Sequence, residues 1–183
     1  FAVMGSELVT AVEGISRPTV GLLNVGQEEM KGNEQVKGAH RFLSNSELNY
    51  IGYVEGDDIY VRDNLDIVVA DGFVGNVALK NTEGAAKMIK HFMTAEFKRN
   101  ILTRLQALVA MPVLRALGRR IDPRRYNGAT LLGLRGIVVK SHGGADKLAF
   151  NNAIVIAKKE VKADIASRIE QRVGQQLDLS ASA

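Results

Sequence analysis

The chain has 183 residues, of which 46% are hydrophobic, and it carries a formal net charge of +4 and no cysteine. This length is enough to bury one sizeable core without disulfide bonds. The lack of cysteine excludes a thiol nucleophile and a Cys-ligated zinc site in this chain, and it is typical of a reducing compartment.

The positive charge is concentrated in one segment. Residues 98–125 contain eight lysine or arginine side chains and one acid, Asp122, whereas the rest of the chain is mildly acidic. No stretch approaches the ~20 consecutive apolar residues of a membrane-spanning helix, and the first residues have neither a basic leader nor the apolar core of a signal peptide. We therefore expect a cytoplasmic protein whose acidic globular body carries one basic segment.

Helical and strand-like patterns alternate through residues 1–70. A helix is predicted over residues 1–12, ended by Gly14, and a second helix follows a polar loop at 26–34 that contains two glycines. Residues 55–62 form a connector with room for a short helix. Three apolar runs of strand length, typical of strands buried on both faces of a parallel sheet, lie at 19–25, 48–54 and 66–70.

The third apolar run leads into a glycine-containing turn. It stops at Asp71 and Gly72, and a helical pattern begins near Asn76. Gly72 and Gly75 allow the backbone to approach a ligand closely, and the amino end of the new helix supplies free N–H groups and a partial positive charge. This combination predicts an anion site, most naturally for phosphate. The alternative is a glycine-rich turn that serves only steric needs.

The second half of the chain begins with the basic segment. Residues 97–120 are predicted to form a kinked basic amphipathic helix or a helical hairpin, because arginines flank an apolar stripe that Pro112 interrupts. A glycine-rich stretch, a short β-branched strand at 137–140, a polar turn at 141–146 and a final helix follow. Strand, loop and helix units in this order indicate an α/β fold with a mostly parallel sheet.

Polar or glycine-rich loops follow the predicted strands that end near residues 25, 70 and 140. In an open parallel sheet such loops gather at the carboxyl edge of the strands, where ligands bind. We therefore expect Lys31, Asp71, Asn76 and His142 to share one cleft.

Each of these four side chains has a functional and a structural interpretation. Lys31 can meet a phosphate as a compact point charge or be a solvated loop lysine. Asn76 can donate to an oxyanion or cap its helix. His142 can act as a general base or be a structural histidine, and Asp71 can orient a partner or make an Asx turn.

Several catalytic motifs are missing from the sequence. It contains no Gly-x-Ser-x-Gly nucleophile turn, no Walker A pattern and no complete dinucleotide fingerprint. His40 and His91 lie in helical stretches without metal-ligand spacing, and we interpret both as structural. We expect no cofactor and no metal, and a reaction that depends on positioning and charge stabilisation rather than on a protein nucleophile.

The basic segment has three interpretations: a solvated helix face or dimer contact, a membrane-surface contact, or a nucleic-acid contact. Its apolar face and flanking arginines favour the membrane surface, and the uncharged run at 106–114 is too short to span a bilayer. The lack of interleaved aromatic residues argues against nucleic acid. The same patch would attract an acidic partner protein.

Five motifs resemble those of a known enzyme family. They are Val-Gly-Leu-Leu-Asn-Val-Gly-Gln-Glu-Glu-Met-Lys-Gly-Asn-Glu at 20–34, Asn-Tyr-Ile-Gly-Tyr-Val-Glu at 49–55, Asp-Gly-Phe-Val-Gly-Asn-Val-Ala-Leu-Lys at 71–80, Tyr-Asn-Gly-Ala-Thr-Leu-Leu-Gly-Leu-Arg at 126–135 and Lys-Ser-His-Gly at 140–143. In this order they closely resemble the carboxyl-terminal half of the bacterial acyl-ACP:phosphate acyltransferase family, where ACP is acyl carrier protein. The amino-terminal half is then expected to be absent from this chain.

The resemblance implies a fold, a reaction and partners. The fold would be a single-domain three-layer α/β/α sandwich similar to isocitrate and isopropylmalate dehydrogenases, with residues 97–120 protruding as a basic amphipathic hairpin. The reaction would transfer a fatty acyl group from acyl-ACP to inorganic phosphate, giving acyl phosphate for phospholipid synthesis. The family also looks like a cytoplasmic homodimer that touches the membrane peripherally.

The resemblance also implies roles for particular residues. Lys31 would neutralise the phosphate nucleophile, Asn76 would hold phosphate or the thioester oxyanion, and His142 would assist. The residues expected to bind phosphate or substrate are Asp71, Gly72, Gly75, Asn24, Gly26 and Glu29. The residues expected to contact the membrane or ACP are Leu105, Leu108, Val109, Arg115, Arg119 and Arg120.

Two other functions remain open at this point. A phosphotransacetylase-like transferase would use the same phosphate turn with acyl-CoA as the donor. A non-catalytic, membrane-associated sensor of acyl groups or nucleotides would bind its ligand without turnover. A dehydrogenase has little support, because the dinucleotide fingerprint is incomplete.

Overall fold

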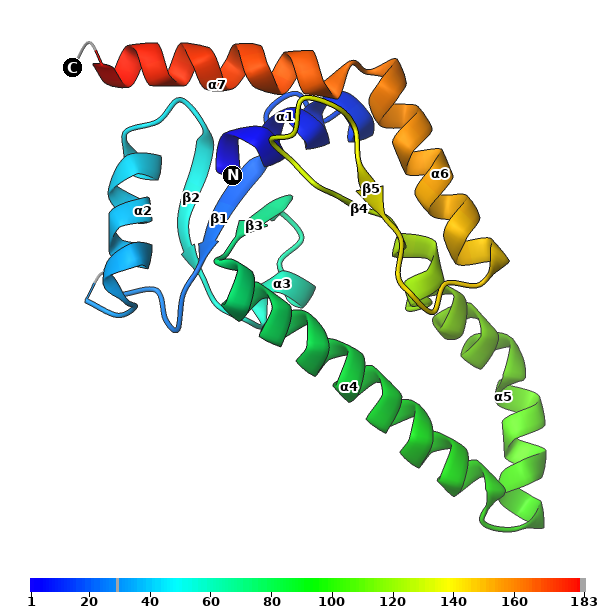
Figure 1. Ribbon diagram of the computed structural model, residues 1–183. Coiled ribbons are helices and arrows are strands. Elements are labelled where there is room, and N and C mark those ends of the chain that lie inside the picture. Colours follow the sequence, from blue (N-terminus) through cyan, green and yellow to red (C-terminus); the bar gives the residue numbers. More distant parts are fainter. Residues whose placement is uncertain (29, 182–183) are drawn as a thin grey trace. The chain divides into compact units, whose positions relative to one another are not determined.

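The computed structural model describes residues 1–28 and 30–181 (Figure 1). The chain divides into two compact units, one made of residues 1–70 with 126–183 and the other of residues 71–125. The parallel sheet and its covering helices belong to the first unit, and a pair of long helices makes up most of the second.

The first unit is built on a three-stranded parallel sheet with the strand order β2-β1-β3. The strands are β1 (Thr19–Leu23), β2 (Asn49–Val54) and β3 (Ile67–Val69). The helices of this unit are α1 (Ala2–Glu13), α2 (Glu34–Ser44), α3 (Asp58–Val61), α6 (Lys147–Lys162) and α7 (Ile165–Ala181). The α/β class with a parallel sheet, expected from the sequence, is confirmed.

The central strand β1 explains why this sheet is tightly packed. Val20 and Leu22 are buried, and Gly21 lies so close to β2 that an added Cβ would be 2.6 Å from a methyl of Val54. Only glycine fits there without moving the neighbouring strand. α2 packs on β1 and β2, and α1 contacts β3, α6 and α7. The sheet therefore carries the core of the first unit.

Local signals start and stop the flanking helices as expected. α1 ends at Gly14, which adopts the left-handed conformation with φ of 76°. α2 begins after Asn33, whose side chain accepts a hydrogen bond from the Val36 N–H at 2.9 Å. The short helix α3 lies inside the predicted connector.

The predicted strand at 137–140 does not join the parallel sheet, so that part of the prediction is wrong. β5 (Val139–Lys140) pairs antiparallel with β4 (Ala129–Thr130) in a separate two-stranded sheet, just after the 3₁₀ helix η1 (Pro123–Tyr126). An antiparallel pair needs only a short connection, whereas a parallel partner requires a longer crossover. A nearby partner thus satisfied the backbone groups of β5.

The second unit contains α4 (Gly72–Lys98) and α5 (Ile101–Arg120), joined by Arg99 and Asn100. α4 starts at Gly72 and not near Asn76, which corrects the predicted boundary. The hairpin consists of α4 and α5, so residues 97–120 do not form a hairpin by themselves. Pro112 lies inside α5 without ending it.

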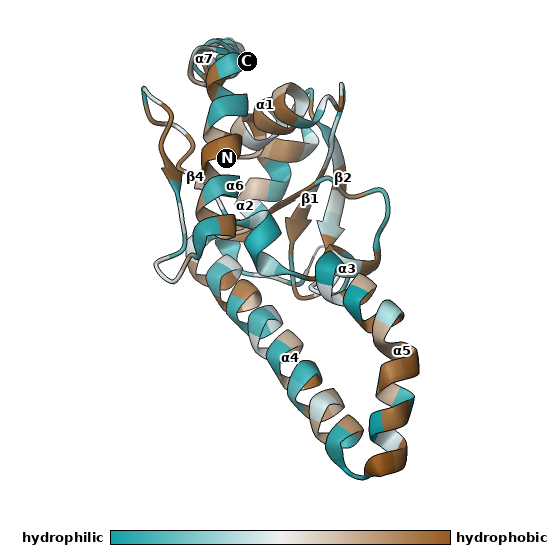
Figure 2. Cartoon of the chain, turned by 90° about the vertical axis from the view of Figure 1, so that its right-hand side faces the viewer, coloured by the Kyte–Doolittle hydropathy of each residue, from teal (hydrophilic) through white to brown (hydrophobic). Residues whose placement is uncertain are grey.

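α5 begins with a reciprocal capping box. The Asn100 side chain accepts from the Thr103 N–H at 2.9 Å, and the Thr103 hydroxyl accepts from the Asn100 N–H at 3.1 Å. Figure 2 shows hydrophobic residues along much of this helix. Within the described residues, the stretch Ile101–Tyr126 is long and apolar enough to cross a membrane, by length and composition alone. This corrects the expectation that no stretch approaches spanning length.

Candidate active site

The loop between β1 and α2 contains Lys31 and its closest partners. Asn24, buried at the end of β1, donates from Nδ2 to the carbonyl of Gly26 at 3.0 Å and to that of Lys31 at 3.5 Å. The Lys31 Nζ lies 2.8 Å from Oε2 of Glu28. The buried asparagine therefore shapes the loop, and the loop brings an ammonium and a carboxylate together at its surface.

In the pair of Lys31 and Glu28, each side chain stabilises the charged form of the other. The hydrogen bond from Lys31 lowers the pKa of Glu28, and the hydrogen bond to Glu28 raises the pKa of Lys31. Both groups are therefore charged at neutral pH. The Lys31 side chain is 46% exposed, so an anion from solvent can compete with Glu28 for it.

An open cleft of about 600 Å³ adjoins this loop. It is lined by Glu28, Met30, Glu34, Lys37, His40, Arg41 and Tyr53. His40 stacks on Tyr53 with ring centroids 4.4 Å apart, and its Nδ1 lies 2.8 Å from the Tyr50 hydroxyl. These contacts account for His40 as a structural residue of the α2 face.

The turn after β3 is organised by Asp71, which caps α4. One carboxylate oxygen accepts from the N–H groups of Phe73 at 2.8 Å and Val74 at 3.0 Å, and the Gly75 N–H donates to the Asp71 carbonyl. The N–H groups that the sequence offered to an anion are thus largely engaged within the chain. The Asx-type interpretation of Asp71 is confirmed.

Asn76 is the fifth residue of α4 and is exposed, so it does not cap the helix. Gly72 and Gly75 lie in the first turn of α4 and not in a loop. The local geometry leaves the Asn76 amide accessible on the outside of the first helical turns. Its proposed contact with an oxyanion stays a prediction.

His142 lies in the polar turn between β5 and α6. The Gly144 N–H donates to His142 Nδ1 at 3.1 Å, and the His142 N–H donates to Oδ1 of Asn127 at 2.9 Å. Asn127 is buried, and its Nδ2 also donates to Ser141 Oγ and to the Ala149 carbonyl, each at 2.8 Å. One asparagine therefore fixes the backbone that carries His142.

The sequence did not single out Asn127 or Glu28. The pair Asn127-Gly128 is a turn signal, but nothing in it indicates bonds to the turn after β5 and to α6. Lys31 lay within helical-turn spacing of Glu28, which is the signal that could have found the ion pair.

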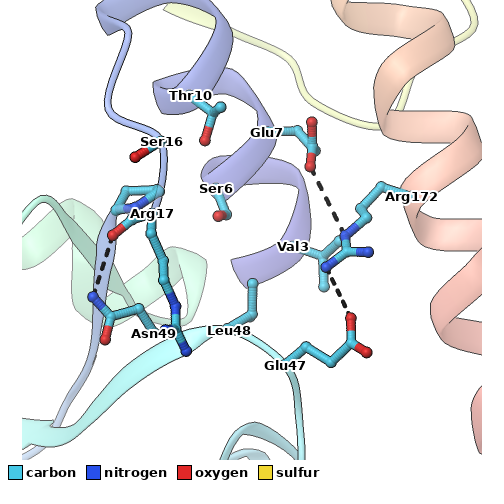
Figure 3. A pocket seen from close by; sticks show the side chains of 11 residues that line it. Val3, Ser6, Glu7, Thr10, Ser16, Arg17, Glu47, Leu48, Asn49 and Arg172 are labelled. Carbon is cyan, nitrogen blue, oxygen red and sulfur yellow. Dashed lines mark hydrogen bonds and ion pairs between the residues drawn. The ribbon is translucent and has the colours of Figure 1, made fainter.

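A second cavity, of about 220 Å³, lies far along the strands from the Lys31 loop, at the residues that precede β1 and β2 (Figure 3). Arg172 of α7 reaches Glu47 at 3.1 Å and Glu7 of α1 at 3.9 Å there. Ligands of open parallel sheets bind at the carboxyl ends of the strands. We therefore interpret this ion-paired cavity at the amino ends as structural.

The predicted contact residues lie on α5. Leu105, Leu108 and Val109 are exposed, with Val109 at 84%, and Arg115 is exposed on the same helix. Arg119 and Arg120 lie in its last turn. Cations at a helix carboxyl end are favourable for the helix dipole, which gives these two arginines a structural role as well.

The predicted site residues therefore fall into three local groups. Asn24, Gly26 and Lys31 meet in the β1–α2 loop, and His142 stands in its own turn of the first unit. Asp71, Gly72, Gly75 and Asn76 form the start of α4 in the second unit. Glu29 lies outside the described residues. The single shared cleft stays a prediction.

Comparison with known proteins identifies the family. A family model described as "Fatty acid synthesis protein" matches residues 1–168. The phosphate acyltransferase of Methylococcus capsulatus is 62% identical over 94% of this chain and 51% of its own length, and that of Alkalilimnicola ehrlichii is 60% identical over 94% and 50%. The chain spans about half the length of the curated relatives it matches. The chain belongs to the fatty acid synthesis protein family.

Proposed function

We propose that the protein containing this chain transfers a fatty acyl group from acyl-ACP to inorganic phosphate. The relatives carry the name phosphate acyltransferase over sequences that are 53–62% identical to this chain. The structural observation that carries the proposal is the exposed ammonium of Lys31, held beside a glycine at the carboxyl end of a central parallel strand. A compact cation in that place suits a phosphate.

The reaction needs little beyond positioning and charge. A phosphate oxygen attacks the thioester carbonyl carbon, the carbon–sulfur bond breaks, and the ACP thiolate leaves and takes up a proton from the phosphate or from water. Phosphate is partly a dianion at neutral pH, so a strong base is unnecessary. Lys31 releases Glu28, binds the phosphate and neutralises its charge. Asn76 donates a hydrogen bond to phosphate or to the carbonyl oxygen.

The fold and assembly of the whole protein are part of the same proposal. The three-layer sandwich, the homodimer and the peripheral attachment of a cytoplasmic enzyme follow from the family resemblance. α5 supports attachment to a membrane surface, because Leu105, Leu108 and Val109 are exposed on a helix that also carries arginines. Its uncharged run at 105–114 is about 15 Å long at 1.5 Å per residue, about half of a hydrocarbon core of roughly 30 Å. Lying on the surface therefore fits better than spanning.

The experiment measures acyl phosphate formed from acyl-ACP and labelled phosphate by the full-length protein. We expect the Lys31→Ala and Asn76→Ala variants to lose about a hundredfold of kcat/KM, the scale of a lost oxyanion donor. Lys158→Ala, an exposed lysine on α6, is the matched control and keeps parental turnover. Folded Lys31 and Asn76 variants with parental turnover would place the catalytic centre elsewhere.

Two alternatives are decided by the same assay. Faster turnover with acyl-CoA than with acyl-ACP would favour a phosphotransacetylase-like enzyme. Binding of either donor without turnover in the parent would favour a sensor. Neither has a specific structural observation in its favour, so acyl transfer from acyl-ACP to phosphate is our conclusion.

A further inference from the structure

Asn127 is a buried residue that links the turn after β5 to α6. Its side chain makes three hydrogen bonds: from Nδ2 to Ser141 Oγ and the Ala149 carbonyl, and at Oδ1 from the His142 N–H. A side-chain amide has two N–H donors and two lone pairs on its oxygen, and three of these four positions are then used. The turn that follows β5 and the first turn of α6 are therefore both tied to Asn127.

The backbone beside Asn127 is also fixed. Gly128 has φ of 126°, and an added Cβ would lie 2.8 Å from the Ile156 side chain and 3.1 Å from Cα of Ala153. A glycine is therefore required where the chain just before β4 passes directly over α6. Asn127 is thus held by packing on one side and by hydrogen bonds on the other.

The turn held by Asn127 sets the tautomer of His142. The His142 Nδ1 accepts the hydrogen bond from the Gly144 N–H, and the His142 carbonyl accepts from the Ala145 N–H at 3.0 Å. A ring nitrogen that accepts a hydrogen bond carries no proton, so the neutral ring has its proton on Nε2. The exposed face of His142 therefore offers an N–H donor and not the lone pair that a general base requires.

We propose that Asn127 is a positioning residue that holds the turn at 141–144 so that His142 presents a neutral Nε2–H donor to the oxygen of the reacting thioester. This rests on the proposed acyl transfer. The carbonyl oxygen gains negative charge as phosphate attacks, and a preorganised neutral donor stabilises it. The role differs from the general-base role that the sequence leaves open.

The first test separates donor from base with two substitutions at one position. In the full-length protein, His142→Gln keeps an amide N–H near the place of Nε2, whereas His142→Ala keeps neither donor nor base. We expect His142→Gln to stay within about tenfold of parental kcat and His142→Ala to fall about a hundredfold. His91→Gln, on α4, is the matched control and keeps parental turnover. Equal losses in the Gln and Ala variants would overturn the donor role.

The second test asks whether Asn127 acts through His142. We expect Asn127→Ala to lower kcat tenfold or more in the parent, on the order of one displaced donor, but by less than about threefold in the His142→Ala background. An equal loss in both backgrounds would mean that Asn127 acts independently, and would overturn the positioning role. Ser141→Ala is a milder variant for the case in which Asn127→Ala does not fold, because it removes only one of the groups that Asn127 donates to. Its loss of kcat should likewise be smaller in the His142→Ala background than in the parent.

The third test has no link to turnover. Nitrogen-15 NMR of histidine-labelled full-length protein, assigned by the signal lost in His142→Gln, reports which ring nitrogen carries the proton. We expect a protonated Nε2 and an unprotonated Nδ1 for His142, and a protonated Nδ1 would overturn the inference. Failure of the parent to form acyl phosphate would refute the proposed function, and the NMR spectrum would still decide the tautomer.

Discussion

Gly26 is the glycine whose substitution tests the Lys31 site most directly. A Cβ at this position would lie 2.6 Å from Cδ and 2.8 Å from Nζ of Lys31, and 2.8 Å from Oε2 of Glu28. Carbon atoms in contact sit about 3.5–4.0 Å apart, so the lysine must move by about 1 Å. The atoms that would clash belong to the ends of flexible side chains, so the fold itself need not change.

The expected effect of Gly26→Ala is therefore on catalysis and not on stability. A displacement of about 1 Å in a positioning group can cost about a hundredfold in rate, so we expect kcat/KM to fall between about tenfold and a hundredfold. The backbone at Gly26 has no positive φ, so alanine is allowed there and restricts the unfolded chain. The free energy of unfolding should stay unchanged or rise by up to about 1 kcal/mol.

The assay combines the phosphate dependence of acyl phosphate formation with a denaturant melt of the same full-length variant. Gly38→Ala is the matched control, because Gly38 lies inside α2 and a Cβ added there would meet open space. It should gain about 0.5–1 kcal/mol of stability and keep parental kinetics. Parental kinetics in a folded Gly26→Ala protein would refute the idea that the position of the Lys31 ammonium matters.

Three further predictions concern charge, capping and pH. Glu28→Gln removes the carboxylate that competes with phosphate for Lys31, so the KM for phosphate should fall by up to about fivefold, most clearly at low salt. Asp71→Ala removes the cap of α4 and should cost about 1 kcal/mol in a thermal melt, whereas Asp71→Asn should cost only a few tenths. Burial raises the pKa of Tyr50 from 10.0 to about 12, so folding favours its neutral form. Its stabilisation should be complete below pH 10 and be lost as the pH rises to about 12, and Tyr50→Phe should remove that loss in denaturant melts.

Each of these three predictions would be contradicted by a particular result. A higher KM for phosphate in Glu28→Gln would mean that the carboxylate positions Lys31 instead of competing with the ligand. Equal melting temperatures for the parent and Asp71→Ala would show that the cap adds no net stability to α4. A Tyr50→Phe protein that loses stability above pH 10 as steeply as the parent would assign the alkaline transition to other groups.

Much of the architecture follows from local patterns in the sequence. The apolar runs that form β1, β2 and β3 are of strand length and hydrophobic, as expected of strands buried in a parallel sheet. Gly14 ends α1 because few other residues adopt its left-handed conformation. The same patterns place Lys31 in a loop after the central strand. These features depend on residues that are close together in the chain.

The tertiary structure decided which of several competing hydrogen-bond partners each polar group binds. Whether β5 pairs with the parallel sheet or with β4 is a choice among backbone acceptors that the periodicity of either strand cannot show. The carboxylate of Asp71 competes with solvent and ligand for the first N–H groups of α4, and its success moves the helix start to Gly72. Asn127 bonds to groups in the turn after β5 and on α6, which only folding brings together. The sequence by itself thus determined the elements and the family, and the tertiary structure alone decided which polar groups meet, because hydrogen bonds between distant residues depend on packing.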